Sequence, residues 1–341
     1  MTTTVYDIAY LEFSATDHTS AVDYLTRSFG FTEAASCEES HRSSTLLRQG
    51  DVRIVVTSGP ATETYLAAHG DGISNIAFSC TDTPATLARA QAAGACRIGP
   101  ATLSGFGDVR HTLVPRGPHT DAHPGLPDDR PWVTVPSRPG QTAEGFVREL
   151  DHLAVLVPHG TLHDTVRFYE DAYDLKQYSS EYVEVGAQAM NSIVVRSGSG
   201  KVTFTIIEPD TTRQSGQVDG FLSRNAGAGV QHLAFLVDDV VAAVRGLRAR
   251  GVRFLTTPDA YYQALTERVG HLQEAIDDLR DTHVLADRDE WGYLLQLFTE
   301  SPYERNTMFF ELIQRRGAKG FGAGNIKALY ESVERERVSG A

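Results

Sequence analysis

Long hydrophobic runs are absent from this chain of 341 residues. A membrane-spanning helix needs roughly 20 consecutive apolar residues, and no stretch approaches that length. The opening residues, Met1 to Thr4, are not followed by the basic region and apolar run of a secretory signal. We therefore expect a soluble protein that has no membrane partner and is located in the cytoplasm.

Cysteine is scarce and basic residues are outnumbered. The three cysteines (Cys37, Cys80 and Cys96) lack CxxC spacing, which argues against a disulfide framework and favours reduced thiols in a cytoplasm. The formal charge is −13, from 31 Lys and Arg against 44 Asp and Glu. No Lys/Arg-rich stripe offsets this charge, so we expect no nucleic-acid partner.

An internal repeat is the most informative feature of the sequence. DIAYLEF at 7–13 corresponds to LDHLAVL at 150–156, and DGISNIAF at 71–78 corresponds to AGVQHLAF at 228–235. In each half these apolar runs are followed by segments with helical spacing, and alternating residues indicate further strands. The repeat predicts an α+β fold in which each half contains βαβββ units, with curved mixed sheets and helices outside.

The chain is long enough for two domains. Residues 115–145 are rich in Pro, Gly, Asp and His without periodicity, which indicates a linker or a surface excursion. We place the boundary so that 1–147 forms one domain and 148–341 the other. A glycine-rich stretch at 317–324 precedes an amphipathic segment at 325–334, whose helix either packs passively on the sheet or acts as a lid.

Three polar residues stand within apolar β runs of the second half. A lone histidine in such a run is more often a satisfied core residue, but His152 and His232 occupy corresponding places in the repeat. Glu311 lies in the apolar run 308–313, where a buried carboxylate needs a strong partner such as a metal. Two imidazoles and one carboxylate form the facial triad of Fe(II) oxygenases, which leaves positions for a 2-oxo acid and O₂.

The first half lacks this set of residues. Tyr10 stands at the position of His152 and Asn75 at the position of His232, and no buried glutamate follows in 109–114. We therefore expect one metal per chain, bound by the second half, and a structural role for the first half.

Several ordered motifs resemble those of the 4-hydroxyphenylpyruvate dioxygenase family, which has the vicinal oxygen chelate fold. They are GAGVQHLA at 227–234, FLTTPDAYY at 254–262, GYLLQLFT at 292–299, FFELIQR at 309–315 and GFGAGN at 320–325. The resemblance covers nearly all of 148–336 and, more weakly, the first half. It implies two vicinal oxygen chelate domains, a 2-oxo acid substrate, O₂ and Fe(II), with His152, His232 and Glu311 as the iron ligands.

The same resemblance assigns further positions to the pocket and the lid. Those expected to act in catalysis are Gln296, Phe298 and Asn325. Those expected to bind substrate are Ser192, Thr205, Ile207, Gln217, Gln231, Phe309, Phe321 and Ile326.

Two reactions on 4-hydroxyphenylpyruvate occur within the family, and one pocket stretch bears on the choice. Enzymes that form homogentisate usually carry Pro-x-Asn-Glu-Pro, whereas residues 205–209 place Thr205 at the Pro and Ile207 at the Asn. Ile326 follows the lid Asn, where Phe is common, and 185–192 resembles the branch that forms 4-hydroxymandelate. We therefore predict hydroxylation of the benzylic carbon to 4-hydroxymandelate, which would suit antibiotic biosynthesis.

The alternatives are neutral drift in a homogentisate-forming enzyme and, within the wider superfamily, a drug-sequestering binder or a Zn or Ni isomerase. Binders generally lack the triad, so the three candidate ligands argue against that class. Exposed strand edges in the first half make a homodimer plausible.

Overall fold

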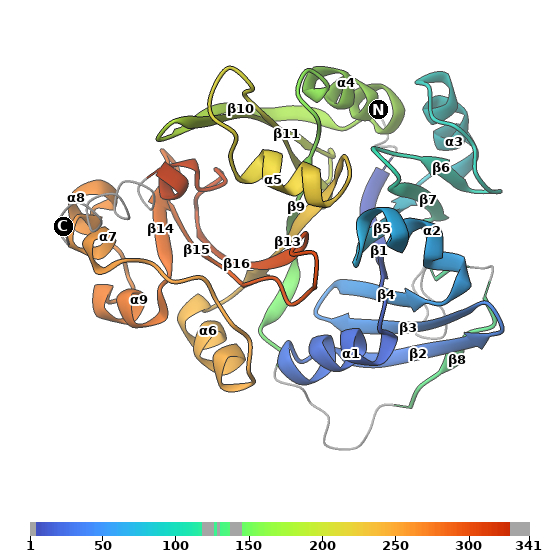
Figure 1. The fold of residues 1–341 in the computed structure, drawn as a ribbon, viewed down its shortest axis with the longest axis horizontal. Coiled ribbons are helices and arrows are strands. Elements are labelled where there is room, and N and C mark those ends of the chain that lie inside the picture. The colour runs from blue at the N-terminus through green and yellow to red at the C-terminus, as the bar shows by residue number, and fades with distance from the viewer. Residues whose placement is uncertain (1–4, 118–125, 128–129, 137–144, 328–341) are drawn as a thin grey trace.

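The computed structural model describes residues 5–117, 126–127, 130–136 and 145–327, and it contains two curved eight-stranded sheets (Figure 1). Most helices lie outside the sheets, whereas the helix α5 (Gln217–Arg224) packs on the concave side of the second sheet. The first sheet has the strand order β6-β7-β5-β1-β4-β3-β2-β8. Its strands are β1 (Val5–Ser14), β2 (Thr32–Glu39), β3 (Arg42–Gln49), β4 (Val52–Ser58), β5 (Gly72–Cys80), β6 (Thr102–Ser104), β7 (Arg110–Pro115) and β8 (Val133–Thr134). Its helices are α1 (His18–Asp23), the π-helix η1 (Tyr24–Ser28), the 3-10 helix η2 (Pro60–Thr62), α2 (Glu63–His69) and α3 (Thr83–Ala92).

The second sheet has the strand order β10-β11-β12-β9-β13-β16-β15-β14. Its strands are β9 (Val147–Leu156), β10 (Lys176–Val185), β11 (Gln188–Arg196), β12 (Thr203–Pro209), β13 (Gly229–Val237), β14 (Leu285–Arg288), β15 (Tyr293–Phe298) and β16 (Phe309–Arg316). Its helices are α4 (Leu162–Tyr173), α5 (Gln217–Arg224), α6 (Val240–Ala249), α7 (Asp259–Gln263), α8 (Leu265–Val269) and α9 (Ile276–Thr282).

Strand pairing confirms the repeat and the α+β class. β1 pairs parallel with β4 and antiparallel with β5, which pairs parallel with β7. β9 pairs in the same way with β12 and β13, and β13 with β16. The equivalent helices α3 and α6 also begin alike, because the side chains of Asp82 and Asp239 accept hydrogen bonds from the backbone N–H groups of Ala85 and Ala242. The division at residue 147 stays a prediction.

The register aligns the two halves residue by residue. Tyr10 pairs with Ala77 in the first sheet, and His152 pairs with Ala234 in the second. Thr112 pairs with Ala77 from β7, as Glu311 pairs with Ala234 from β16. Tyr10 and Thr112 therefore occupy the positions of His152 and Glu311.

The segment predicted to be a linker or surface excursion also makes specific contacts with the first sheet in its described parts. Leu126 is buried against the concave face of the first sheet together with Tyr10. Arg130 forms an ion pair with Glu12 of β1 at 2.5 Å. β8 adds a short strand to the edge of β2. Each contact is made by a single residue or a residue pair, so the sequence has no periodic pattern that predicts it.

The two sheets share one hydrophobic core. Phe29, which follows η1, contacts Phe235 and Phe310 of the second sheet, with ring centroids 6.1 and 4.9 Å apart. His69 of α2 adds a polar connection, because its Nδ1 lies 2.6 Å from the carbonyl oxygen of Asn225. None of the helices in the described ranges combines the length and hydrophobicity that a membrane crossing needs.

Candidate metal centre

The three predicted ligands come together from neighbouring strands on the concave side of the second sheet. His152 and Glu311 both pair with Ala234 of β13, one from each side. His232 lies two residues before Ala234, so alternation along β13 directs both side chains to the same face. The small side chain of Ala234 leaves room for the side chains of His152 and Glu311 to meet in front of it.

Distances and burial at this cluster suit a metal ion. Glu311 Oε2 lies 3.2 Å from His232 Nε2 and 3.5 Å from His152 Nε2. The exposed fractions of His152, His232 and Glu311 are 3, 8 and 2%. Glu311 Oε1 is buried without a hydrogen-bond partner among the described residues, a costly state that a bound cation would relieve. This donor set fits Fe(II), which other facial triads of two histidines and one carboxylate bind.

Neighbouring side chains fix the direction of both imidazoles. His152 Nδ1 donates to Asp151 Oδ1 at 2.8 Å, so Nε2 keeps its lone pair for the metal. Arg315 donates to both oxygens of Asp151, at 2.6 and 2.7 Å. Burial alone would raise the pKa of Asp151, but the hydrogen bonds from Arg315 and His152 outweigh it and hold the pKa well below its usual range. The carboxylate therefore stays ionised as a fixed acceptor for His152.

His232 is oriented by a local irregularity of β13. The pairing of β13 with β9 shifts register between Val230 and His232, which places a bulge at Gln231. The side-chain oxygen of Gln231 thereby lies 3.3 Å from His232 Nδ1. Burial lowers the pKa of His232, against the opposing effect of Glu311, which favours the neutral imidazole that a metal requires.

Phenylalanine rings surround the cluster. Phe309 stacks on the ring of His232 at 5.0 Å, and Phe298 meets the same ring edge-on at 5.8 Å. Phe321 approaches His152 edge-on at 5.1 Å. These three positions were predicted from the resemblance, and their rings place apolar surface around the two imidazoles.

Two more predicted residues bring unpaired polar atoms into the buried interior. Gln296 is 1% exposed and Asn325 is fully buried. Gln296 Oε1 and Asn325 Nδ2 have no hydrogen-bond partner among the described residues. A Cβ at Gly322 would lie 2.2 Å from Gln296 Oε1, so the turn that leads to Asn325 packs directly on this amide and requires glycine. A ligand that accepts from Asn325 and donates to Gln296 would satisfy both atoms.

An apolar wall completes the concave side. Ile207 and Ile326 pack against a cluster that includes Val218 and Phe221 of α5. Ser192 pairs with Ile207 across β11 and β12, so their side chains share a face.

The remaining two predicted pocket residues differ in exposure. Thr205 lies on the same face as Ile207, but its hydroxyl donates to the carbonyl oxygen of Leu153 at 3.3 Å. Gln217 begins α5 and is exposed. The predicted helix at 325–334 lies outside the described residues from 328 onward.

The sequence did not predict the residues that orient His152 and Asn325. Asp151 and Arg315 orient His152, and alternation along β16 could have revealed Arg315, because it shares a face with Glu311. Tyr261 donates to Asn325 Oδ1 at 2.7 Å, and Arg268 Nη2 lies 3.3 Å from the same oxygen. Tyr261 belongs to the motif at 254–262, but nothing in the sequence connects that motif with Asn325.

Both halves of the chain are similar to known protein families. Residues 2–110 match the family model described as hydroxyphenylpyruvate dioxygenase, N-terminal. Residues 151–269 match the glyoxalase/bleomycin resistance protein/dioxygenase superfamily. The 4-hydroxyphenylpyruvate dioxygenase of Aspergillus fumigatus is 33% identical over 92% of this chain and 88% of its own length. That of Dictyostelium discoideum is 32% identical over 93% of this chain and 94% of its own.

A solved structure is more similar still. A triply substituted variant of 4-hydroxymandelate synthase from Streptomyces coelicolor is 50% identical, with a TM-score of 0.86 over 98% of this chain and 99% of its own. Together with the buried ligand set, these likenesses place the protein: the chain belongs to the 4-hydroxyphenylpyruvate dioxygenase family of Fe(II)-dependent dioxygenases.

Proposed function

We propose that this enzyme converts 4-hydroxyphenylpyruvate and O₂ into 4-hydroxymandelate and CO₂. The observation that carries the proposal is the apolar environment of Ile207, which packs with Ile326 against Val218 and Phe221. Homogentisate-forming relatives usually carry Asn at the position of Ile207. An apolar side chain there offers the aromatic ring no hydrogen bond toward the product of ring attack, so the benzylic carbon is favoured. The 50% identity to a 4-hydroxymandelate synthase adds support.

The residues of the chain divide the work of binding and orientation. His152, His232 and Glu311 would hold Fe(II), which supplies the activation of O₂ and the oxidative decarboxylation of the 2-oxo acid. The rings of Phe298, Phe309 and Phe321 keep water from the ligands and confine the substrate.

The unpaired amide atoms offer the polar contacts of the pocket. Asn325 Nδ2 can donate to the phenol oxygen of the substrate while Gln296 Oε1 accepts its proton. We assign Ser192, which pairs with Ile207, and Gln231, which contacts His232, to the wall of the pocket. We assign Thr205 and the exposed Gln217 to its outer part.

Product identification tests this proposal. The enzyme is incubated with Fe(II), ascorbate, O₂ and 4-hydroxyphenylpyruvate, and the product is analysed by NMR, because the two candidates are isomers. A benzylic CH–OH signal is the expected result. A trisubstituted ring with an intact CH₂ would mean homogentisate and would remove the interpretation of Ile207, while the metal site would stand.

A pair of variants ties the outcome to the residue. Ile207→Asn introduces an amide at the apolar wall, and we expect part of the product to become homogentisate. Ile207→Leu keeps the wall apolar and serves as the matched control, with 4-hydroxymandelate as its expected product. Equal product ratios in the two variants would contradict the assigned role.

We also infer a cytoplasmic location and a homodimer. The cysteines Cys37, Cys80 and Cys96 are all unpaired, as a reducing compartment would leave them. The first sheet ends in the short edge strand β8, whose Val133 is 66% exposed. Light scattering of the purified protein measures the oligomeric state directly, and a monomer mass would refute the homodimer.

A further inference from the structure

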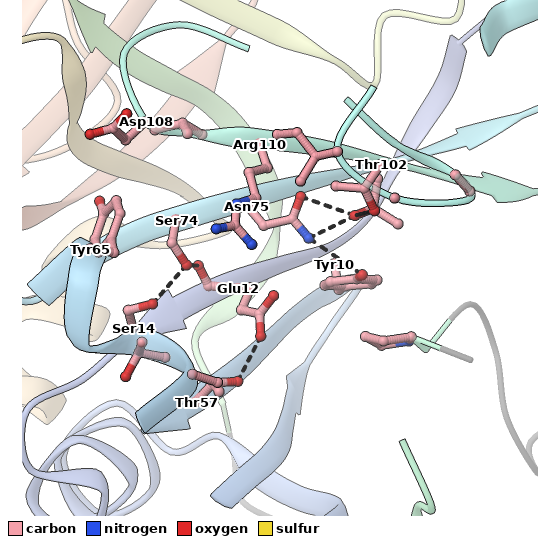
Figure 2. Close-up of a pocket in the computed structure, with 18 of the residues that line it drawn as sticks. Tyr10, Glu12, Ser14, Thr57, Tyr65, Ser74, Asn75, Thr102, Asp108 and Arg110 are labelled. Carbon is pink, nitrogen blue, oxygen red and sulfur yellow. Dashed lines mark hydrogen bonds between the residues drawn. The ribbon is translucent and has the colours of Figure 1, made fainter. Parts of the chain in front are cut away.

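The first sheet has a cavity of its own (Figure 2). It lies at the position in the first sheet that corresponds to the cluster of candidate metal ligands in the second sheet. Its volume is about 810 Å³, within the range of small-molecule sites. Tyr10, Asn75 and Thr112 line it at the positions that correspond to His152, His232 and Glu311. The catalytic reaction uses none of these lining residues.

The floor of this cavity is polar but has no metal-binding set. Thr112 Oγ1 lies 3.0 Å from Asn75 Nδ2 and 3.2 Å from Asn75 Oδ1. Asn75 Nδ2 also lies 3.5 Å from the hydroxyl of Tyr10. A phenol, an amide and a hydroxyl are neutral groups, so the floor suits an organic ligand rather than a cation.

One wall carries a compensated pair of charges. Arg130 donates to Glu12 at 2.5 Å, and its Nη1 donates to Ser44 and Thr57 at 2.9 and 3.0 Å. The side chains of Arg130 and Glu12 are only 6 and 13% exposed. These partners fix the pair in place, and it adds no net charge to the cavity.

Arg110 supplies a positive charge that has no ion-pair partner among the described residues. It begins β7, and Figure 2 shows its guanidinium beside Asn75 and above Glu12, directed into the cavity. No ion pair or hydrogen bond of this guanidinium occurs within the part of the chain that the structure describes. Asp108, the acidic residue nearest in sequence, lies instead 2.8 Å from His69 Nε2. A guanidinium with free donors binds a carboxylate through two parallel hydrogen bonds.

We propose that this cavity binds a small organic carboxylate with an apolar, ring-sized body. Arg110 pairs with the carboxylate, and the ring packs against the apolar patch formed by Tyr10, Val114 and Leu126. The polar floor of Asn75 and Thr112 accommodates a hydroxyl substituent. This second site is independent of which product the metal centre forms, because the residues that line it all lie within 10–130, before the second sheet begins.

Binding of a matched pair of probes tests the proposal. Phenylacetate and its uncharged counterpart phenylacetamide are titrated calorimetrically into the iron-loaded, full-length protein under nitrogen. We expect phenylacetate to bind in this cavity. Arg110→Ala should weaken that binding at least tenfold, because a charge-assisted hydrogen bond is lost. Phenylacetamide should be at least tenfold weaker and insensitive to the substitution. Phenylacetate bound at the iron is common to all variants, so it does not imitate this difference.

Arg27→Ala is the matched control, because Arg27 is a 79% exposed arginine of the same sheet domain and does not line the cavity. It should bind phenylacetate as the unchanged protein does. Thermal unfolding of each variant establishes that it is folded. Three results would overturn the proposal: no phenylacetate binding sensitive to position 110, equal affinity for the acid and the amide, or equal weakening by Arg27→Ala.

Discussion

The amide of Asn325 is oriented by residues outside the pocket, and replacing Tyr261 by Phe tests how much this orientation contributes. Tyr261 donates to Asn325 Oδ1 at 2.7 Å, and Arg268 approaches the same oxygen at 3.3 Å. Tyr261 and Arg268 both contact the Oδ1 atom of Asn325, so the Nδ2 atom is left to face the ligand. Tyr261→Phe removes the shorter contact while the ring still fills its place.

The magnitude follows from the hydrogen bonds lost. The hydroxyl of Tyr261 also contacts the backbone N and O of Ala286, at 2.9 and 3.0 Å. Removing it should lower the free energy of unfolding by about 1–3 kcal/mol. The preference for one orientation of Asn325 should fall by about 1–1.5 kcal/mol, which corresponds to a decrease in kcat of roughly 5- to 13-fold.

Tyr262→Phe is the control for packing and stability. Both tyrosines are 2% exposed, but the hydroxyl of Tyr262 donates to the carbonyl oxygen of Val284 at 3.2 Å and has no contact with Asn325. We expect it to lose about 1 kcal/mol of stability with kcat unchanged. The assay is O₂ uptake at saturating substrate, beside thermal unfolding of each variant. An equal decrease of kcat in both variants, or none in Tyr261→Phe, would refute the orienting role.

Two further predictions concern the affinity for iron and the contact between His111 of the first sheet and Tyr169 of α4. Arg315→Lys replaces the two hydrogen bonds to Asp151 by the contact of a single charge, so iron affinity should fall about 10- to 100-fold in a chelator competition. Arg316→Lys is the control, because Arg316 pairs with Glu274 at 3.4 Å, and it should leave iron affinity unchanged. Burial lowers the pKa of His111 to about 4 while its Nε2 lies 2.7 Å from the hydroxyl of Tyr169. Below about pH 6.5 the unfolded chain binds a proton there that the folded chain does not, so stability should decrease by about 1.4 kcal/mol per pH unit toward pH 4. Urea unfolding of His111→Gln should show a flatter pH dependence, and an identical slope would contradict the assignment.

The sequence was sufficient to predict the cluster of three candidate metal ligands, because each residue carried a local signal. His152 and His232 stand at equivalent places of a repeat, and Glu311 is a carboxylate within an apolar strand. Their partners carried no such signal. Asp151 and Arg315 are 164 positions apart, and Tyr261 and Asn325 are 64 apart. Contacts of this kind depend on how strands and loops pack, which periodicity does not encode.

The same limit explains the segment between the sheets. Alternation and helical spacing report elements that bury one face, whereas Leu126 and Arg130 each insert a single side chain into the first sheet. A stretch rich in Pro, Gly and Asp therefore reads as a linker even where it closes a cavity. Helices α7 to α9 were missed for a related reason, because each is seven residues or shorter and shows too few turns for a pattern.

Comparison of the two sheets indicates why, among the described residues, only the second sheet brings together a set of side chains that could hold a metal. Both direct three side chains toward one point, in front of Ala77 in the first sheet and Ala234 in the second. Glu12, however, pairs with Asn75 as Ala154 pairs with His232, so a charged side chain occupies the position where the metal centre has a methyl group. Because Arg130 neutralises Glu12, changing Tyr10, Asn75 and Thr112 to the ligand set would still leave an ion pair beside the new site and no counterpart of the Asp151–Arg315 support. The fold supplies the convergence of the three positions, and the surrounding charges decide whether that convergence binds a metal or an organic ligand.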